Sequence, residues 1–200
     1  MHGLLKHLIP ISLCLMVFPV AAEEWNGNIN FSFGYKNIND PFFDGFDADA
    51  HFQVGMMVDL THSSWPVSIA LDRFRSHRSL TLTAVDALIF AGTVRVEMTT
   101  EEYNLGLRKI WQPSKRTRPY LGAGLVQSEV EYSEKVPFQD EQADSDDGIG
   151  YWYGGGLYFT LARHFNIGLD LRRSHVDVTL FGKTVDAGGT STSLFIGFHW

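Results

Sequence analysis

The chain has 200 residues, with 23 acidic and 16 basic side chains and a formal net charge of −7. This acidic balance argues against a general nucleic-acid binder, which would present a basic surface. The 15 Phe, 7 Tyr, 5 Trp and 19 Gly suit many short strands, and they argue against a disordered chain or a helical bundle.

The first residues have the three parts of a secretory signal: a basic start, an apolar run from Leu8 to Val20, and small residues ending at Ala22. We therefore predict a signal peptide over residues 1–22 and a β-barrel domain over residues 23–200. The apolar run is shorter than the roughly 20 residues of a spanning helix, and no later stretch is as continuously apolar. A membrane protein built from this chain would have to cross the bilayer with strands.

Apolar and polar residues alternate with a period of two at about eight places along the remaining chain, and each place predicts a strand. A change of parity near Thr99, in the fourth strand, predicts a β-bulge. The last strand runs to the aromatic Trp200; such a strand needs a partner on both sides, which indicates a closed barrel. The predicted strands lie in 25–35, 52–60, from 67 onward, 103–111, 120–132, 151–161, 167–171 and 194–200.

The connections between these strands alternate in length. Long and short connections then lie on opposite rims, as in transmembrane barrels with short periplasmic turns and longer outer loops. The predicted fold class is all-β: an eight-stranded antiparallel up-and-down transmembrane β-barrel. Long connections are expected at 37–49, about 74–93, 133–148 and 182–189, and tight ones at 61–66, 112–119 and 162–166.

Alternation alone does not say whether the apolar face points in or out, so a soluble barrel with an apolar cavity is the alternative. A soluble barrel needs a charged, well-solvated outside. Here the polar face has few charges and many Asn, Ser and Gly residues, as in Asn28, Asn30 and Ser32. Such a face fits a crowded interior, and we expect the apolar side chains to meet lipid.

Three segments carry a resemblance to a known family: Arg118–Leu125, Asp186–Gly189 and the closing Leu194–Trp200. Together with the strand pattern, they resemble the OmpA-like family of small outer-membrane β-barrels, of the eight-stranded outer-membrane protein X and W types. The resemblance implies residence in the outer membrane, among its lipid and lipopolysaccharide, and recognition of the terminal strand by the outer-membrane assembly machinery. The residues of that signal are Leu194, Ile196, Phe198 and Trp200, where Trp200 departs from the commoner terminal Phe.

If the apolar face meets lipid, charged residues of the opposite parity enter the lumen. The interior of an eight-stranded barrel is just wide enough for side chains to fill it, so we expect a packed polar network. Buried charges need partners, which makes Arg108 and Arg172 the expected hubs. A narrow cation-selective path is the alternative. The expected lumen residues are Asp59, Asp72, Glu102, Arg108, Glu129, Glu131, Asp170 and Arg172.

Basic residues also gather where two strands reach the long-loop rim. Arg73, Arg75 and Arg78 end the third strand, and Arg173 ends the seventh. Because arginine forms bidentate, charge-assisted bonds to phosphate, our hypothesis is that this rim binds lipopolysaccharide. Ordinary solvated loop bases are the alternative.

Two of the expected long loops have unusual compositions. Gln139–Gly148 is densely acidic, but its acids do not follow the order of a helix-loop-helix calcium site. We expect a solvated anionic loop there, with loose divalent-cation binding as the alternative. Pro41–Asp47 places three Phe among acids, which suits either a contact surface or a segment folded onto the barrel mouth.

Catalysis and metal binding have little support in the sequence. Ser76–His77 and Ser174–His175 are adjacent pairs, and neighbours on a strand point to opposite faces, so only a cross-strand combination stays open. The histidines are scattered, and the single cysteine, Cys14, lies in the predicted signal. We expect no catalytic residues, no metal and no cofactor.

The sequence thus predicts a non-enzymatic, monomeric outer-membrane barrel with a structural or surface-interaction role: envelope integrity, adhesion or lipopolysaccharide contact. Its expected partners are membrane lipid, lipopolysaccharide and the assembly machinery, and not nucleic acid. A narrow channel or carrier for small hydrophobic or ionic solutes is the second reading, and a lipid-modifying enzyme is the third.

Overall fold

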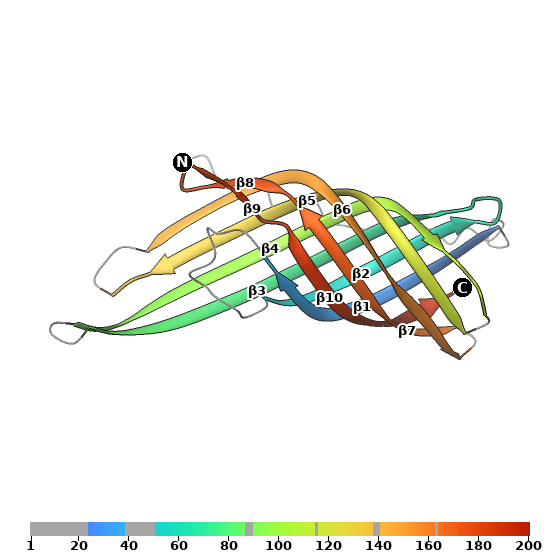
Figure 1. The fold of residues 1–200 in the computed structure, drawn as a ribbon, viewed down its shortest axis with the longest axis horizontal. Coiled ribbons are helices and arrows are strands. Elements are labelled where there is room, and N and C mark those ends of the chain that lie inside the picture. Colours follow the sequence, from blue (N-terminus) through green and yellow to red (C-terminus); the bar gives the residue numbers. More distant parts are fainter. Residues whose placement is uncertain (1–23, 39–50, 87–89, 115, 138–140, 163) are drawn as a thin grey trace, which may run out of the picture.

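Eight strands of the chain form a closed antiparallel barrel (Figure 1). The computed structural model describes residues 24–38, 51–86, 90–114, 116–137, 141–162 and 164–200. The predicted signal peptide and most of the first long loop lie outside these residues. The barrel strands are β1 (Trp25–Asn37), β2 (His51–His62), β3 (Ser68–Asp86), β4 (Phe90–Ile110), β5 (Thr117–Lys135), β6 (Gln142–Ala162), β7 (Phe165–His175) and β10 (Gly189–His199).

The barrel is of the up-and-down type, because barrel strands that follow one another along the chain pair with each other, and the last, β10, pairs with β1. The closing register runs from Asn28 opposite His199 to Asn37 opposite Thr190. The predicted fold class is therefore confirmed. Among the described residues, no helix is long and apolar enough to cross a membrane.

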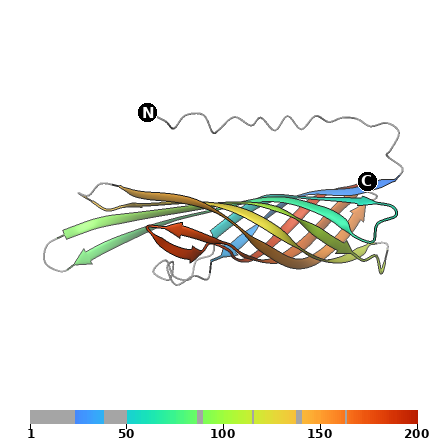
Figure 2. The ribbon, with the colours of Figure 1, turned by 90° about the horizontal axis from the view of Figure 1, so that it is seen from above.

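The strands differ in length, and this gives the barrel two unlike ends. β3 to β6 have 19 to 21 residues, whereas β1, β2, β7 and β10 have 11 to 13. The four long strands continue past the mouth at the end opposite the C-terminus (Figures 1 and 2). We call this end the long-strand rim and the other, where short turns join the strands, the short-turn rim.

The prediction of long loops is wrong for two segments, which are mostly strand. Most of the segments 74–93 and 133–148 belongs to the extended hairpins β3–β4 and β5–β6. Beyond His77 of β3 and Tyr151 of β6, these hairpins have no further pairing with β2 or β7. They form an open four-stranded sheet above the barrel.

Large apolar side chains cover the outside of the barrel, which confirms the predicted orientation. Phe31, Leu105 and Leu121 are each more than half exposed, whereas the polar residues of alternate parity are buried. Such an outer surface would be unfavourable in water and is suited to hydrocarbon. Polar residues on the buried face include Asn28, Asn30, Ser32, Gln53, Ser68 and Ser193.

Above the barrel, the apolar face changes sides. In β4, Leu105 and Leu107 point outward, but Val96 and Met98, which have the other parity, are buried inside. The pairing of β4 with β3 and with β5 is continuous through Thr99, so the predicted bulge is wrong. The change of parity reflects the surroundings: lipid outside the barrel favours apolar side chains there, whereas water outside the protruding sheet favours polar ones.

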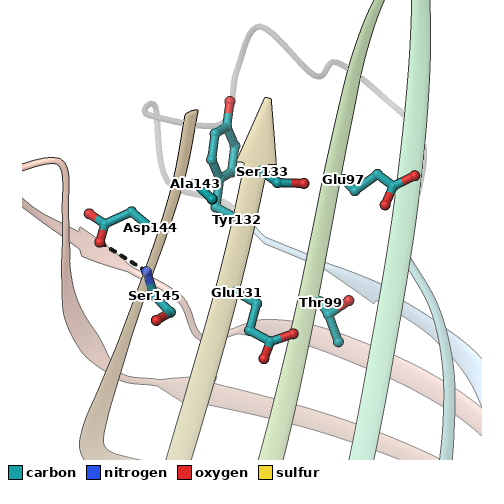
Figure 3. A pocket seen from close by; sticks show the side chains of 8 residues that line it. All are labelled: Glu97, Thr99, Glu131, Tyr132, Ser133, Ala143, Asp144 and Ser145. Carbon is teal, nitrogen blue, oxygen red and sulfur yellow. Dashed lines mark hydrogen bonds between the residues drawn. The ribbon is translucent and has the colours of Figure 1, made fainter. Parts of the chain in front are cut away.

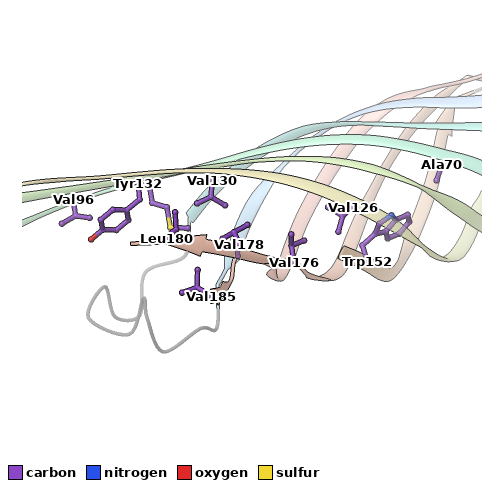
Figure 4. Close-up of a cluster of buried hydrophobic side chains, with 12 residues drawn as sticks. Ala70, Val96, Val126, Val130, Tyr132, Trp152, Val176, Val178, Leu180 and Val185 are labelled. Carbon is purple, nitrogen blue, oxygen red and sulfur yellow. The ribbon is translucent and has the colours of Figure 1, made fainter. Parts of the chain in front are cut away.

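A small hairpin fills the inner side of this protruding sheet. β8 (Asp177–Leu180) and β9 (Lys183–Asp186) are joined by Phe181 and Gly182, with φ of 50° and 74°. Positive φ at both central residues is typical of a type I′ turn. This hairpin, which we call the cap, replaces the early part of the predicted loop 182–189. Its cluster (Figure 4) contains Val96, Met98, Val130, Tyr132, Val176, Val178, Leu180 and Val185.

Candidate functional site

The middle of the lumen is filled by a chain of ion pairs. Arg108 pairs with Asp59 through Nη1, and with Asp72 through Nη2 at 2.8 Å. Arg172 lies 2.9 Å from the same Asp72 carboxylate and 3.5 Å from Asp170. All five side chains are buried, and they come from four different strands. The two arginines are therefore the hubs that link three carboxylates across the bore.

Aromatic residues close the spaces around this network. Tyr120 donates a hydrogen bond to Asp170, and Tyr158 donates one to Asp59. The guanidinium of Arg172 lies 4.4 Å from the ring centres of both Phe74 and Trp152. These contacts replace the water that would otherwise solvate the charges. The sequence analysis missed both tyrosines because it placed only charged residues in the lumen, although Tyr158 has the parity opposite to Leu157 and Phe159, which face outward.

A second buried group joins the barrel wall to the segment that follows the cap. Lys36 donates to Glu102 at 2.7 Å and to the carbonyl oxygen of Ala187 at 2.9 Å, and Ser174 also donates to Glu102, at 3.0 Å. Lys36 and Glu102 are buried. Lys36 is absent from the predicted set, although it shares the parity of Asn28, Asn30 and Ser32 and could have been found from it.

Two residues of the predicted lumen set lie elsewhere. Glu129 and Glu131 are exposed on the outer face of β5. They share the parity of Leu121 and Leu125, which face outward lower on the same strand, so placing them in the lumen was an error. At their height the outer face meets water, and an acid is well solvated there.

The corrected set is close to electrically neutral. Four carboxylates are buried in the described part of the barrel, together with Lys36, Arg108 and Arg172. A fourth cation, Arg118, lies half-buried below them at the short-turn rim. A balanced, paired network is what burial of charges requires, because an uncompensated charge in a low-dielectric interior costs several kcal/mol.

The basic residues predicted to bind lipopolysaccharide do not form one cluster. Arg73 and Arg75 point outward from β3, and Arg173 points outward from β7, on the opposite side of the barrel. Arg78 has the inward parity and is half-buried. Arg73 forms an ion pair with Glu101 and lies 5.5 Å from the ring centre of Tyr103.

The predicted acidic loop is mostly strand. Residues 142–148 belong to β6, where Asp144 and Asp146 turn toward the cap. Their carboxylates accept hydrogen bonds of 2.6 Å from the backbone amides of Phe181 and Thr179. These acids therefore hold the cap in place. In the described part of the chain, no three acidic, His or Cys side chains are placed to bind a metal ion.

A shallow hollow of about 460 Å³ lies on the protruding hairpins (Figure 3). Its lining brings together side chains of three strands, and Glu131 lies between Ser145 on one side and Thr99 on the other. The register places Thr99 opposite Glu131, and Glu131 opposite Ser145. The part of the outer face around this hollow is thus acidic and polar.

Neither adjacent Ser–His pair is joined by a hydrogen bond. Ser76 is buried and bonds to Thr100, whereas His77 is exposed on the other face. A Ser–His–acid chain that sequence reasoning missed does occur at the short-turn rim. Ser64 Oγ lies 2.7 Å from His62 Nδ1, and His62 Nε2 lies 3.0 Å from Glu24. The same Nδ1 also accepts the Ser64 amide, so this group closes the β2–β3 turn.

The four residues of the predicted assembly signal all lie on the outer face of β10 and at its end. Leu194, Phe198 and Trp200 are each more than half exposed, and Ile196 is 42% exposed. The terminal strand therefore presents a continuous apolar stripe.

The chain matches the family model described as "Outer membrane protein beta-barrel domain" over residues 11–198. No curated protein sequence matches it. Among solved structures, it is similar to Ail of Yersinia pestis in complex with the heparin analogue sucrose octasulfate, with 11% identity, a TM-score of 0.60, and coverage of 88% of this chain and 99% of that one.

Two further structures share the fold. A major outer membrane protein from Thermus thermophilus has 10% identity and a TM-score of 0.59, over 88% of this chain and 98% of that one. OprG from Pseudomonas aeruginosa has 11% identity and a TM-score of 0.53, over 88% of this chain and 95% of that one.

Proposed function

The chain belongs to the outer membrane protein β-barrel domain family, and we propose that it is a non-conducting, non-enzymatic barrel that acts through its outer surface. The outer membrane is its location, and the short-turn rim then faces the periplasm. We further propose that residues 1–22 are removed as a signal peptide, and that residues 23–200 form the mature monomer.

The filled lumen is the observation that carries this proposal. Arg108 and Arg172 bridge the bore through Asp59, Asp72 and Asp170, and Trp152 packs beside them. Above them, the cap closes the mouth with an apolar cluster. A permeating ion would have to break several buried ion pairs and cross this apolar layer, so the bore favours a structural role over a channel.

Planar-bilayer recording tests the closed bore. We expect the refolded wild type to give no unitary current steps, while a wide-bore porin prepared in the same way conducts. Reproducible steps from the wild type, altered by Arg108→Ala, would instead identify a conducting path and favour the narrow-channel reading.

The outer face of the protruding sheet is the proposed contact surface. Its middle carries Glu97, Glu101, Glu129 and Glu131; two basic residues, Arg73 and Arg75, lie nearer the membrane, and two others, Arg95 and Lys135, lie farther from it. Complementary charge steers association, so this face favours a basic partner in adhesion. The similar Ail structure contains a heparin analogue, which is a polyanion. On this chain, the acids of the sheet would repel such a ligand.

A binding assay separates these two partner classes. Immobilised wild type is expected to retain a lysine-rich peptide more strongly than heparin, in a salt-dependent manner. Glu129→Lys combined with Glu131→Lys should reverse the preference, because both side chains are exposed. An unchanged preference would show that binding, if any, lies elsewhere.

Lipopolysaccharide contact is retained as a proposal for Arg73, Arg75 and Arg173, which lie just beyond the apolar belt. Because β3 and β7 are on opposite walls, the contacts would be two separate ones. Arg73→Gln with Arg75→Gln should reduce lipopolysaccharide co-purification, whereas Arg116→Gln, exposed at the periplasmic rim, should not. Equal co-purification by both variants would contradict the assignment.

A further inference from the structure

The periplasmic mouth of the barrel contains a cavity of about 730 Å³. Its walls come from the ends of β1 to β6 and of β10 and from the turns between them. Its lining includes the cations Lys109 and Arg118, together with His199 and several amide and hydroxyl side chains. None of its described lining residues is Asp or Glu. The cavity therefore offers several hydrogen-bond donors, and no acidic side chain lines its described part.

Arg118 is the central donor. Its Nη2 donates to the side-chain oxygens of Asn28 at 3.2 Å and Asn166 at 2.8 Å, and both acceptors are neutral. Within the described residues, no carboxylate lies within ion-pairing distance of this guanidinium. Its Nε is buried and has no hydrogen-bond acceptor.

The nearby carboxylate of Asp59 already has several hydrogen-bond donors. Asp59 accepts hydrogen bonds from Arg108, Tyr158 and Asn28. The Arg118 guanidinium lies over the Tyr158 ring, with 5.2 Å between the guanidinium carbon and the ring centre. Arg118 is thus positioned by neutral groups; its charge interacts with the Asp59 carboxylate only through space, and no ion-pair contact joins the two.

A second orphaned group lies beside it. His199 Nδ1 is buried without a hydrogen-bond partner in the described structure. Trp65, Trp111 and Trp200 also line the cavity, but tryptophans are common where a barrel meets the membrane interface, so they carry no part of the argument.

We propose that this periplasmic cavity binds a small oxyanion, a phosphate or carboxylate group, carried by a soluble molecule. The Nη1 group of the guanidinium, which makes no hydrogen bond within the described residues, is the donor available to an oxygen of such a group, and a charge-assisted bond from arginine is a strong one. Partial burial strengthens the interaction, because water competes less for the donors. Lipid headgroups are disfavoured as the source, since Arg118 has the inward parity of Tyr120 and lies inside the mouth.

Titration of inorganic phosphate into the full mature barrel, in dodecyl maltoside micelles free of phosphate, tests this proposal. The side-chain Nε–H resonance of Arg118 in ¹H–¹⁵N spectra is the reporter. We expect a saturable shift in the wild type, and at least about tenfold weaker binding in Arg118→Gln, because one charge-assisted pair is lost. The reporter for the variant is the indole signal of Trp111 or Trp65.

Lys183→Gln, exposed on the cap at the opposite end of the barrel, is the control for loss of a positive charge and should leave the affinity unchanged. If Arg118→Gln fails to fold, judged by heat-modifiable migration, Arg118→Lys keeps the charge but loses the guanidinium donors and should still weaken binding. Equal affinity in the wild type and the folded Arg118 variant, or a shift reproduced by chloride, overturns the proposal. If phosphatidylglycerol nanodiscs without added phosphate already give the full shift of the Arg118 signal, the oxyanion comes from a lipid headgroup, and the proposal of a soluble ligand is contradicted.

Discussion

Replacing Arg108 by Leu tests whether the ion network holds the barrel together. The guanidinium is fully buried and pairs with Asp59 and Asp72, so its removal leaves two buried carboxylates short of a partner. Breaking a buried pair costs about 3–5 kcal/mol. Since Asp72 keeps Arg172 and Asp59 keeps Tyr158, we expect the free energy of unfolding to fall by about the cost of one pair, 3–5 kcal/mol, and not two.

Urea unfolding in lipid vesicles, followed by tryptophan fluorescence, measures this loss. Arg73→Gln is the matched control, because it breaks an arginine–carboxylate pair that is half exposed, for which a change of about 0–1 kcal/mol is expected. Adding Asp59→Leu to Arg108→Leu should recover part of the loss, since one orphaned carboxylate is then gone. A loss below about 1 kcal/mol for Arg108→Leu would refute the reasoning, because it would mean that the carboxylates need no partner.

The cap gives three further predictions. Burial by itself would raise the pKa of Asp186, but hydrogen bonds from the amides of Val176 and Gly188, and from His175, lower it overall. The stabilisation that these bonds give is present above the ordinary Asp pKa and is lost as the pH falls through the lowered pKa. Hydrogen exchange in the cap should therefore rise in acid, and Asp186→Asn should abolish that rise. Leu180→Ala, at a fully buried site, should cost about 2–5 kcal/mol of cap stability and increase proteolysis within 177–186 while the barrel keeps its heat-modifiable migration. Gly182→Val should destabilise the turn by roughly 1–3 kcal/mol, because a β-branched residue is strained at a φ of 74°; an unchanged exchange rate in the cap would contradict this.

The barrel could be predicted from the sequence because lipid imposes one simple pattern on it. Wherever a strand crosses the apolar belt, residues such as Phe31, Leu105 and Leu121 alternate with polar ones, and the period of two is clear. The same alternation gave Asp59, Asp72, Arg108 and Arg172 their inward positions. Their individual pairs could not be derived, because they depend on the register between strands that are distant in sequence.

The protruding sheet was not predicted because the sequence analysis expected the apolar side chains of each strand to face outward along its whole length, including the part above the membrane. In β5, Leu121 and Leu125 face out, but Val126 and Val130 face in, so the apolar parity changes along one unbroken strand. Read with a single parity, this change resembles a bulge or the end of a strand. It also placed Glu129 and Glu131 in the lumen.

The same inversion explains how the cap is held. β7 places Leu169 and Leu171 outward, whereas Val176 and the cap residues Val178 and Leu180 are buried. A chain leaving the barrel with this pattern has an apolar face that must be covered, and the inner face of β4 and β5 offers the matching surface. Because that face is apolar only above the membrane, each change of parity on β4, β5 and β7 marks the height at which the outside of the protein passes from lipid to water.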